Sequence, residues 1–308
     1  MRLSVLVKIL VVLAIVGAAA FYVLTMPSRA VTGDLPAHTA NLANGETMFN
    51  AGGCASCHTT TGQDDSHRLG GGLSLVTQFG TFKVPNISPD PEHGIGRWSE
   101  ADFINAVLRG VGKNGEHLYP AFPYTSYAHM KLDDVRDLYA FMKTLPADTA
   151  PSAPHQLGFP FNVRRGIGLW KVAFLDTKVF TPEPARDAAL NRGAYLVEGP
   201  GHCAECHSPR NVFGGIITAD RFSGGPDPSG KFWIPNITPH ADGLAKWSVK
   251  DIEFLLETGF KPNMDTVGSG MGEVVQNISK LSAEDRTAMA TYIKALPPRP
   301  GKPPPKSK

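Results

Sequence analysis

The 308-residue chain has few cysteines and little charge. It contains only four cysteines, and all of them lie in two short motifs, so none is left to form a structural disulfide. Charged residues make up 19% of the chain and the formal net charge is +2, which excludes a basic nucleic-acid-binding surface. No Ser-His-Asp arrangement, P-loop or flavin fingerprint stands out. These absences argue against a hydrolase, a nucleotide-dependent enzyme and a DNA- or RNA-binding protein.

Each cysteine pair is followed directly by a histidine. The pentapeptide C-A-S-C-H at residues 54–58 returns as C-A-E-C-H at residues 203–207. Two cysteines three positions apart on a helical turn can form thioethers to one porphyrin edge, and the next histidine then lies under the iron as proximal ligand. A zinc site made from both cysteine pairs would not need either histidine in that place. The pattern therefore predicts two covalently attached haem c groups, held by Cys54, Cys57 and His58 and by Cys203, Cys206 and His207.

One long apolar run lies at the N-terminus, over residues 3–24, and its length allows a helix to span a hydrocarbon core of about 30 Å. A cleaved signal peptide is the alternative, suggested by the alanines at 18–20, but residues 21–24 carry the run past that point. We therefore expect an uncleaved signal-anchor over residues 1–28. Its basic start, with Lys8, keeps the N-terminus in the cytoplasm, so the remainder is expected on the periplasmic side of a bacterial inner membrane, where haem attachment occurs.

An internal repeat relates the two halves of the chain. The spacing between the first-motif histidine and Trp98 recurs between the second-motif histidine and Trp247. Between them, the sequence P-N-I-S-P at residues 85–89 matches P-N-I-T-P at residues 235–239. The repeat predicts a duplicated module, with one haem in each copy.

Each module is expected to contain three helices, of which one enters the motif, one follows the tryptophan and one closes the module. A Ser-x-x-Asp capping pattern after each tryptophan predicts a helix start, and Gly110 and Gly259 predict the ends of these helices. The other helices are expected at residues 42–50, 132–145, 190–197 and 282–296. The expected units are a first module over 40–146, a linker over 147–184, a second module over 185–297 and a disordered, basic, proline-rich tail over 298–308.

The module resembles a class I cytochrome c domain. The resemblance covers residues 42–146 and 186–297, and it rests on the Pro-Asn-Ile turns, the Trp-Ser-x-x-Asp pattern, Y-P-A-F-P-Y at 119–124 and G-M-G-E-V-V at 270–275. The pair is similar to the cytochrome subunits of membrane-bound bacterial alcohol, aldehyde and gluconate dehydrogenases, several of which carry three haem modules where this chain has two. The resemblance implies an all-α fold, with two tandem cytochrome c-like domains after a transmembrane helix.

The second axial ligand decides what each haem does. A methionine sulfur makes the iron six-coordinate and high in potential, and leaves no position for a substrate. In class I domains this methionine lies in the loop before the last helix. In the second copy Met271 fits that place, and Met264 is its rival.

The first copy offers a different candidate. Related sequences often have methionine where this chain has Phe122, which leaves Met130 as the only methionine in the loop. We therefore expect Met130 to be the sixth ligand of the first haem. His117 and His129 are the alternatives, and Met142 is expected in the core of the closing helix.

Two further residue pairs have expected roles near the haems. Trp98 and Trp247 could donate their indole N–H groups to a haem propionate, or could pack the helix start onto the core. Pro85 and Pro235 could offer backbone carbonyls to the proximal histidines, which would raise the donor strength of the rings.

An apolar segment lies in the linker, over residues 159–175, and carries three basic residues. It could be a helix packed between the modules, or an amphipathic patch on the membrane surface. We favour packing, which is the commoner outcome.

The expected function is electron transfer, with substrate chemistry done by a partner enzyme. Electrons would enter one haem from a periplasmic dehydrogenase or a quinol, pass to the other haem, and leave to a soluble cytochrome or a terminal oxidase. The alternatives are a dihaem subunit of a haem-copper oxidase and a dihaem peroxidase. A peroxidase would need one haem with an open or displaceable ligand.

Overall fold

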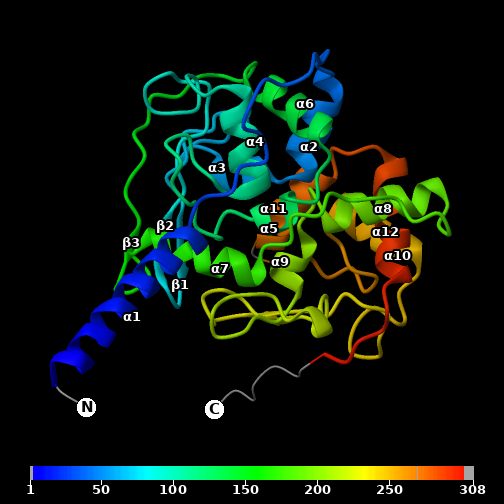
Figure 1. Cartoon of the computed structure of the whole chain (residues 1–308). Helices are drawn as coiled ribbons and strands as arrows, with labels where there is room; N and C mark the ends of the chain where they lie inside the picture. Colours follow the sequence, from blue (N-terminus) through cyan, green and yellow to red (C-terminus); the bar gives the residue numbers. More distant parts are fainter. Residues whose placement is uncertain (1–2, 269, 302–308) are drawn as a thin grey trace.

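The computed structural model describes residues 3–268 and 270–301, and most of its regular structure is helical (Figure 1). Helix α1 (Leu3–Leu24) stands away from the rest of the molecule. Among the described residues, it is the one helix long and apolar enough to cross a membrane. Residues 302–308, which make up most of the expected disordered tail, lie outside the described residues.

The two halves of the chain repeat one helical arrangement. The first half contains α2 (Leu42–Ala51), α3 (Cys54–His58), α4 (Glu100–Arg109), α5 (Tyr124–Tyr127) and α6 (Leu132–Met142). The second contains α8 (Ala188–Glu198), α9 (Cys203–His207), α10 (Val249–Thr258), α11 (Gly270–Ile278) and α12 (Ala283–Ala295). Helix α2 packs against α6, and α8 packs against α12 in the same way. Between the halves lie the 3-10 turn η1 (Arg164–Gly166) and helix α7 (Ile167–Phe174); a second 3-10 turn is η2 (Thr218–Asp220).

The expected helix boundaries after each tryptophan are confirmed. Ser99 caps α4 and forms a capping box with Asp102, and Ser248 caps α10 in the same way. Both helices end at a glycine in the left-handed conformation, with φ of 58° at Gly110 and 78° at Gly259. These ends were predictable because each depends on a few neighbouring residues.

The expected all-α class is incomplete, because short strands pair in the long loops. An antiparallel sheet joins β1 (Ser74–Thr77), β2 (Gly80–Lys83) and β3 (Gln156–Leu157), and a smaller pair joins β4 (Gly225–Pro226) and β5 (Trp233–Ile234). Backbone groups in loops that lie against a core need hydrogen-bond partners, and the ladders supply them. Strand β3 falls within the expected linker but pairs with the first half of the chain.

An asparagine in each Pro-Asn-Ile turn holds the segment that follows the closing helix. The side-chain amide of Asn86 donates to the carbonyls of Asp148 (2.7 Å) and Ala150 (2.9 Å). In the second half, Asn236 donates to the carbonyl of Arg299 at 2.8 Å. Arg299 falls within the expected disordered tail, yet these contacts fix it against the second half.

The closing helix of each half passes very close to a glycine. A Cβ atom built on Gly45 in α2 would lie 2.2 Å from the carbonyl oxygen of Asp137 in α6. A Cβ on Gly193 in α8 would lie 2.0 Å from the carbonyl oxygen of Ala288 in α12. Real Cβ atoms do not approach backbone so closely, so glycine is required where these helices cross.

Gly45→Ala is therefore expected to lower the free energy of unfolding by about 1–3 kcal/mol, because the added methyl group forces α2 and α6 apart. Gly33→Ala is the matched control, since a Cβ there meets nothing within 4 Å. Its expected effect is below about 0.5 kcal/mol. Denaturant unfolding of the haem-loaded protein measures both, and equal midpoints for the two variants would contradict the packing described here.

Candidate haem-binding sites

A cavity of about 650 Å³ opens beside the first motif. Its lining includes the five residues expected to hold or contact the first haem, namely Cys54, Cys57, His58, Trp98 and Met130. Most of the other lining side chains are apolar, among them Met48, Phe103, Val107, Phe122, Leu138 and Met142. The structure thus brings together all the residues expected around the first haem, and its apolar walls suit a porphyrin.

Both motif histidines are held by a proline carbonyl, which confirms the expectation for these turns. Nδ1 of His58 lies 2.9 Å from the carbonyl oxygen of Pro85, and Nδ1 of His207 lies 2.8 Å from that of Pro235. A carbonyl oxygen only accepts, so Nδ1 carries the hydrogen and Nε2 keeps a free lone pair. Burial lowers the pKa of His58 to about 4, against the opposing effect of the Pro85 hydrogen bond. The ring is therefore neutral at pH 7, as a metal ligand must be.

The motif cysteines are also held in their neutral form. Burial, with a smaller contribution from Cys57, raises the pKa of Cys54 to about 12. Burial raises the pKa of Cys57 to about 11 and that of Cys203 to about 12. At the first motif, two thiols three positions apart, a histidine lone pair and an apolar cavity together fit a covalently bound haem.

Met130 lies on the turn between α5 and α6, with 1% of its surface exposed. The two competing histidines do not line the cavity, and each is hydrogen-bonded to a backbone carbonyl elsewhere: His117 through Nε2 and His129 through Nδ1. The corresponding turn of the second half carries Leu281, which is also buried. Burial of Met130 is therefore consistent both with a core side chain and with an iron ligand.

The second motif forms the single turn α9, with Cys203, Cys206 and His207 on it. Trp247, just before α10, and Met271, in α11, are both half-buried against the hydrophobic core. The rival Met264 is 64% exposed. Of the two methionines, only Met271 is packed into the protein.

The two motifs face one another across the interface between the halves. His202, immediately before the second motif, also lines the cavity of the first. Its ring lies 5.5 Å from that of Tyr127, and a Cβ on Gly53 would lie 3.6 Å from its Cε1. Nearby, the side-chain amide of Asn277 in α11 donates to Oγ of Ser56, inside the first motif, at 2.8 Å. Sequence analysis missed His202, whose only signal is its place beside a motif cysteine.

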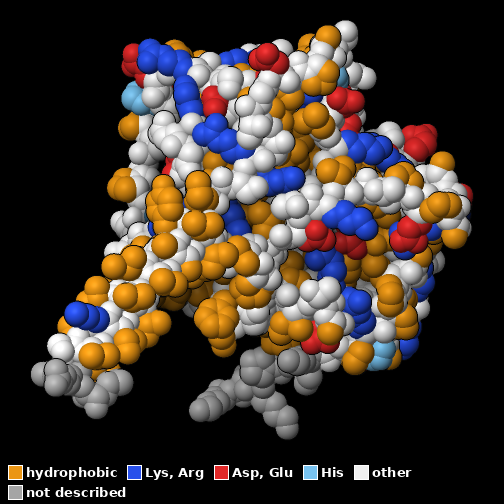
Figure 2. Space-filling model, viewed as in Figure 1, with side chains coloured by type: hydrophobic (Ala, Val, Ile, Leu, Met, Phe, Trp, Pro, Cys, Tyr) orange, Lys and Arg blue, Asp and Glu red, His pale blue; other side chains and the backbone are white. Residues whose placement is uncertain are grey.

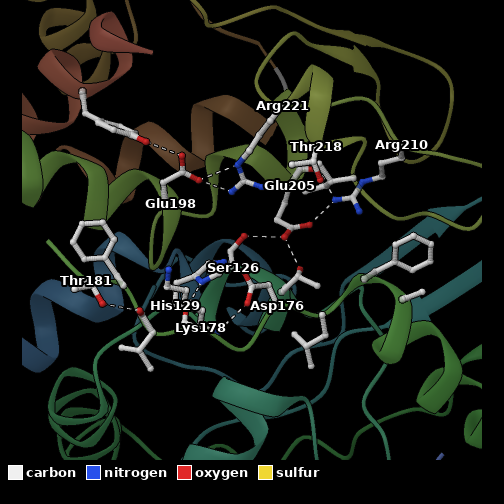
Figure 3. A pocket seen from close by; sticks show the side chains of 18 of the residues that line it. Ser126, His129, Asp176, Lys178, Thr181, Glu198, Glu205, Arg210, Thr218 and Arg221 are labelled. Atoms are coloured by element: carbon white, nitrogen blue, oxygen red, sulfur yellow. Dashed lines mark hydrogen bonds and ion pairs between the residues drawn. The ribbon is translucent and has the colours of Figure 1, made fainter. Parts of the chain in front are cut away.

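A polar cluster holds the other side of this interface (Figure 3). Glu205, between the cysteines of the second motif, accepts from Oγ1 of Thr125 (2.5 Å), Oγ of Ser126 (2.8 Å) and Nη2 of Arg210 (2.6 Å). Burial alone would raise the pKa of Glu205, but Arg210 and the two hydroxyl groups outweigh burial and hold this pKa below its usual value. The second motif is thus fastened directly to α5 of the first half.

Comparison with known proteins supports haem binding and covers nearly the whole chain. The family model Cytochrome c matches residues 42–146. A protein named diheme cytochrome c-type, from Cereibacter sphaeroides, is 45% identical over 295 residues, which cover 94% of this chain and 96% of that protein. This match extends well beyond the first half, so the likeness includes the second motif.

Other relatives are parts of dehydrogenases and are longer than this chain. The cytochrome c subunit of a quinone-dependent alcohol dehydrogenase from Gluconacetobacter polyoxogenes is 37% identical over 294 residues, or 92% of this chain and 61% of the subunit. The cytochrome c subunit of gluconate 2-dehydrogenase from Pantoea cypripedii is 37% identical over 279 residues, or 87% of this chain and 62% of that subunit. The chain therefore spans less than two thirds of either subunit.

The two motifs, the cavity beside the first of them and these likenesses agree. The chain belongs to the cytochrome c family of covalent haem proteins that transfer electrons.

Proposed function

We propose that the chain is a membrane-anchored dihaem cytochrome c, which relays electrons from a periplasmic dehydrogenase or quinol to a downstream cytochrome or terminal oxidase. The proposed units are tandem cytochrome c domains over residues 40–146 and 185–297, each with one haem c. The observation that carries the proposal is the direct contact between the two motif-bearing segments. When bound, haem supplies an iron that takes up and gives off one electron at a time.

The chain's own residues keep the two sites in a fixed relation. Glu205 is bonded to Thr125 and Ser126, while Asn277 is bonded to Ser56, so each motif is hydrogen-bonded to the opposite half. His202 lines the cavity beside the first motif, and its ring lies 5.5 Å from that of Tyr127. A contact held by several hydrogen bonds suits electron passage between the sites, because neither site has to move for the electron to cross.

We propose that Met271 would hold the iron of the second haem together with His207, and Met130 that of the first together with His58. Support for Met271 is its packing against the core, whereas Met264 is exposed. Support for Met130 is its place in the lining of the first cavity.

We also propose that α1 is retained as an anchor, with the haem domains on the periplasmic side. Thr25, at the end of α1, is fully buried. Its Oγ1 accepts from Nε of Arg165 at 2.7 Å, and its carbonyl accepts from Nε2 of His117 at 2.8 Å. These contacts join the end of α1 to the haem-binding part, as suits an anchor better than a removable leader.

The names of the relatives point to a dehydrogenase as the partner, since they include cytochrome subunits of alcohol, gluconate and fructose dehydrogenases. Copurification of the intact, detergent-solubilised protein from its own membranes tests this partner. The expected companion is a dehydrogenase with a flavin, molybdenum or quinone cofactor. Recovery of a copper-containing oxidase core instead would make the chain an oxidase subunit and contradict the proposal.

Substitution of the two methionines tests the ligands. Met130→Leu and Met271→Leu should each remove the near-infrared sulfur-to-iron absorption of one ferric haem, because leucine has no donor atom. Met142→Leu is the matched control, since Met142 also lines the first cavity but belongs to α6, and should leave the spectrum unchanged. An unaltered spectrum in Met130→Leu would instead make Met130 a core residue, like Leu281.

His202→Asn tests the contact between the motifs. Asparagine tolerates the left-handed backbone at this position, where φ is 41°, but removes the ring that contacts Tyr127. After photoreduction of one haem, electron passage to the other should be slower than in the unaltered protein, while haem content and both reduction potentials stay the same. His240→Asn, at a surface histidine paired with Asp242, is the control. Equal rates in both variants would exclude a role for His202.

A further inference from the structure

Exposed apolar side chains lie on and near α7, the helix that contacts the base of α1. Helix α7 buries only Gly168, whereas Leu169 is 44% and Val172 is 69% exposed. Close to α7 in the fold, Phe159 is 83% and Phe213 is 68% exposed. We favoured packing of this segment between the modules. One side of α7 does pack against the protein, at Gly168, but its other side is exposed to solvent.

These side chains come from separate segments that meet in one surface. The ring of Phe161 lies 5.0 Å from that of Phe79, in the turn between β1 and β2. A Cβ on Gly214 would lie 3.2 Å from the same Phe79 ring. Nε1 of Trp170 in α7 donates to the carbonyl of Phe213 at 2.8 Å. We name this surface the apolar collar and define it by Phe159, Phe161, Leu169, Val172, Val212 and Phe213.

The apolar collar is fixed to the end of α1. Nη2 of Arg165 donates to the carbonyl of Tyr22 at 2.8 Å, and its guanidinium lies 4.7 Å from the centre of the Tyr22 ring. Gly168 lets α7 approach, because a Cβ there would lie 2.6 Å from Cα of Thr25. Figure 2 shows hydrophobic side chains along α1 and on the surface at its base.

The charge of the segment indicates what covers the collar. Residues 158–174 carry Arg164, Arg165 and Lys171 and no acidic residue. The three cations are bonded within the protein, since Arg164 donates to the carbonyl of His117, Arg165 to that of Tyr22 and Lys171 to that of Gly110. Exposed aromatic and aliphatic side chains in a segment without carboxylates, which anionic headgroups would repel, suit the membrane interface. An apolar surface of this kind is unfavourable in water, and the nearest apolar medium is the bilayer that α1 enters.

We propose that the apolar collar inserts into the boundary between headgroups and acyl chains of the membrane that α1 crosses. The proposal rests on the retained anchor of the proposed function. Because Phe159 belongs to the linker and Phe213 to the second half, the linker and the second half rest on the same bilayer. The collar and α1 together hold the haem domains in one orientation, rather than on a flexible tether.

Photolabelling from the lipid phase tests this orientation. The haem-loaded, full-length protein is reconstituted into vesicles of phosphatidylethanolamine and phosphatidylglycerol that contain a phospholipid with a diazirine in its acyl chain. After irradiation, mass spectrometry maps the adducts. They are expected on α1 and also within residues 158–174 and 211–215. The double variant Phe159→Ser/Phe213→Ser should lose the collar adducts to background while those on α1 remain.

Phe254→Ser is the matched control, because Phe254 is 40% exposed on α10, which lies away from α1 in Figure 1. This variant should keep the full labelling pattern. Adducts on α1 without any in the collar would overturn the inference and leave the collar open to a protein partner. Absence of adducts from α1 as well would contradict the retained anchor itself, and the inference would fall with it.

Discussion

The hydrogen bond from each motif histidine to a proline carbonyl is the constraint on which the haem sites depend. The carbonyl belongs to a residue 27 positions further along the chain for His58 and 28 for His207. The intervening loop must therefore fold back onto the motif, and Asn86 and Asn236 hold the end of that loop by bonding to the segment after the closing helix. One small contact thus links the iron ligand, the strand-bearing loop and the two crossed helices in each half.

The second level of organisation is the contact between the halves. A chain with two independent modules could place its motifs far apart, but here the segment around His202 enters the wall of the first cavity. Glu205 is buried in the same interface, and its charge is compensated by Arg210 and two hydroxyl groups. A buried carboxylate without such partners would be strongly unfavourable, so the polar cluster also fixes how the halves pair.

Sequence patterns predicted the features that depend on neighbouring residues. The attachment motifs, the Ser99 cap and the glycine at Gly110 all follow from local rules. What escaped prediction depends on contacts between distant segments. Strand β3 pairs with a hairpin more than 70 residues earlier, and His202 reaches a cavity built by the other half. The residues next to each of these segments give no signal of the distant segment that it contacts.

The central claim is that each of the two motifs binds one haem covalently, and the mass of the intact protein tests this claim most directly. Thioether-bound haem stays attached when the chain is denatured, so mass spectrometry of the unfolded protein counts the haems on each molecule. The account predicts the full chain, α1 included, plus two haems. A mass that corresponds to a single haem would show that one motif is not an attachment site, and would contradict the account of an electron relay within one chain.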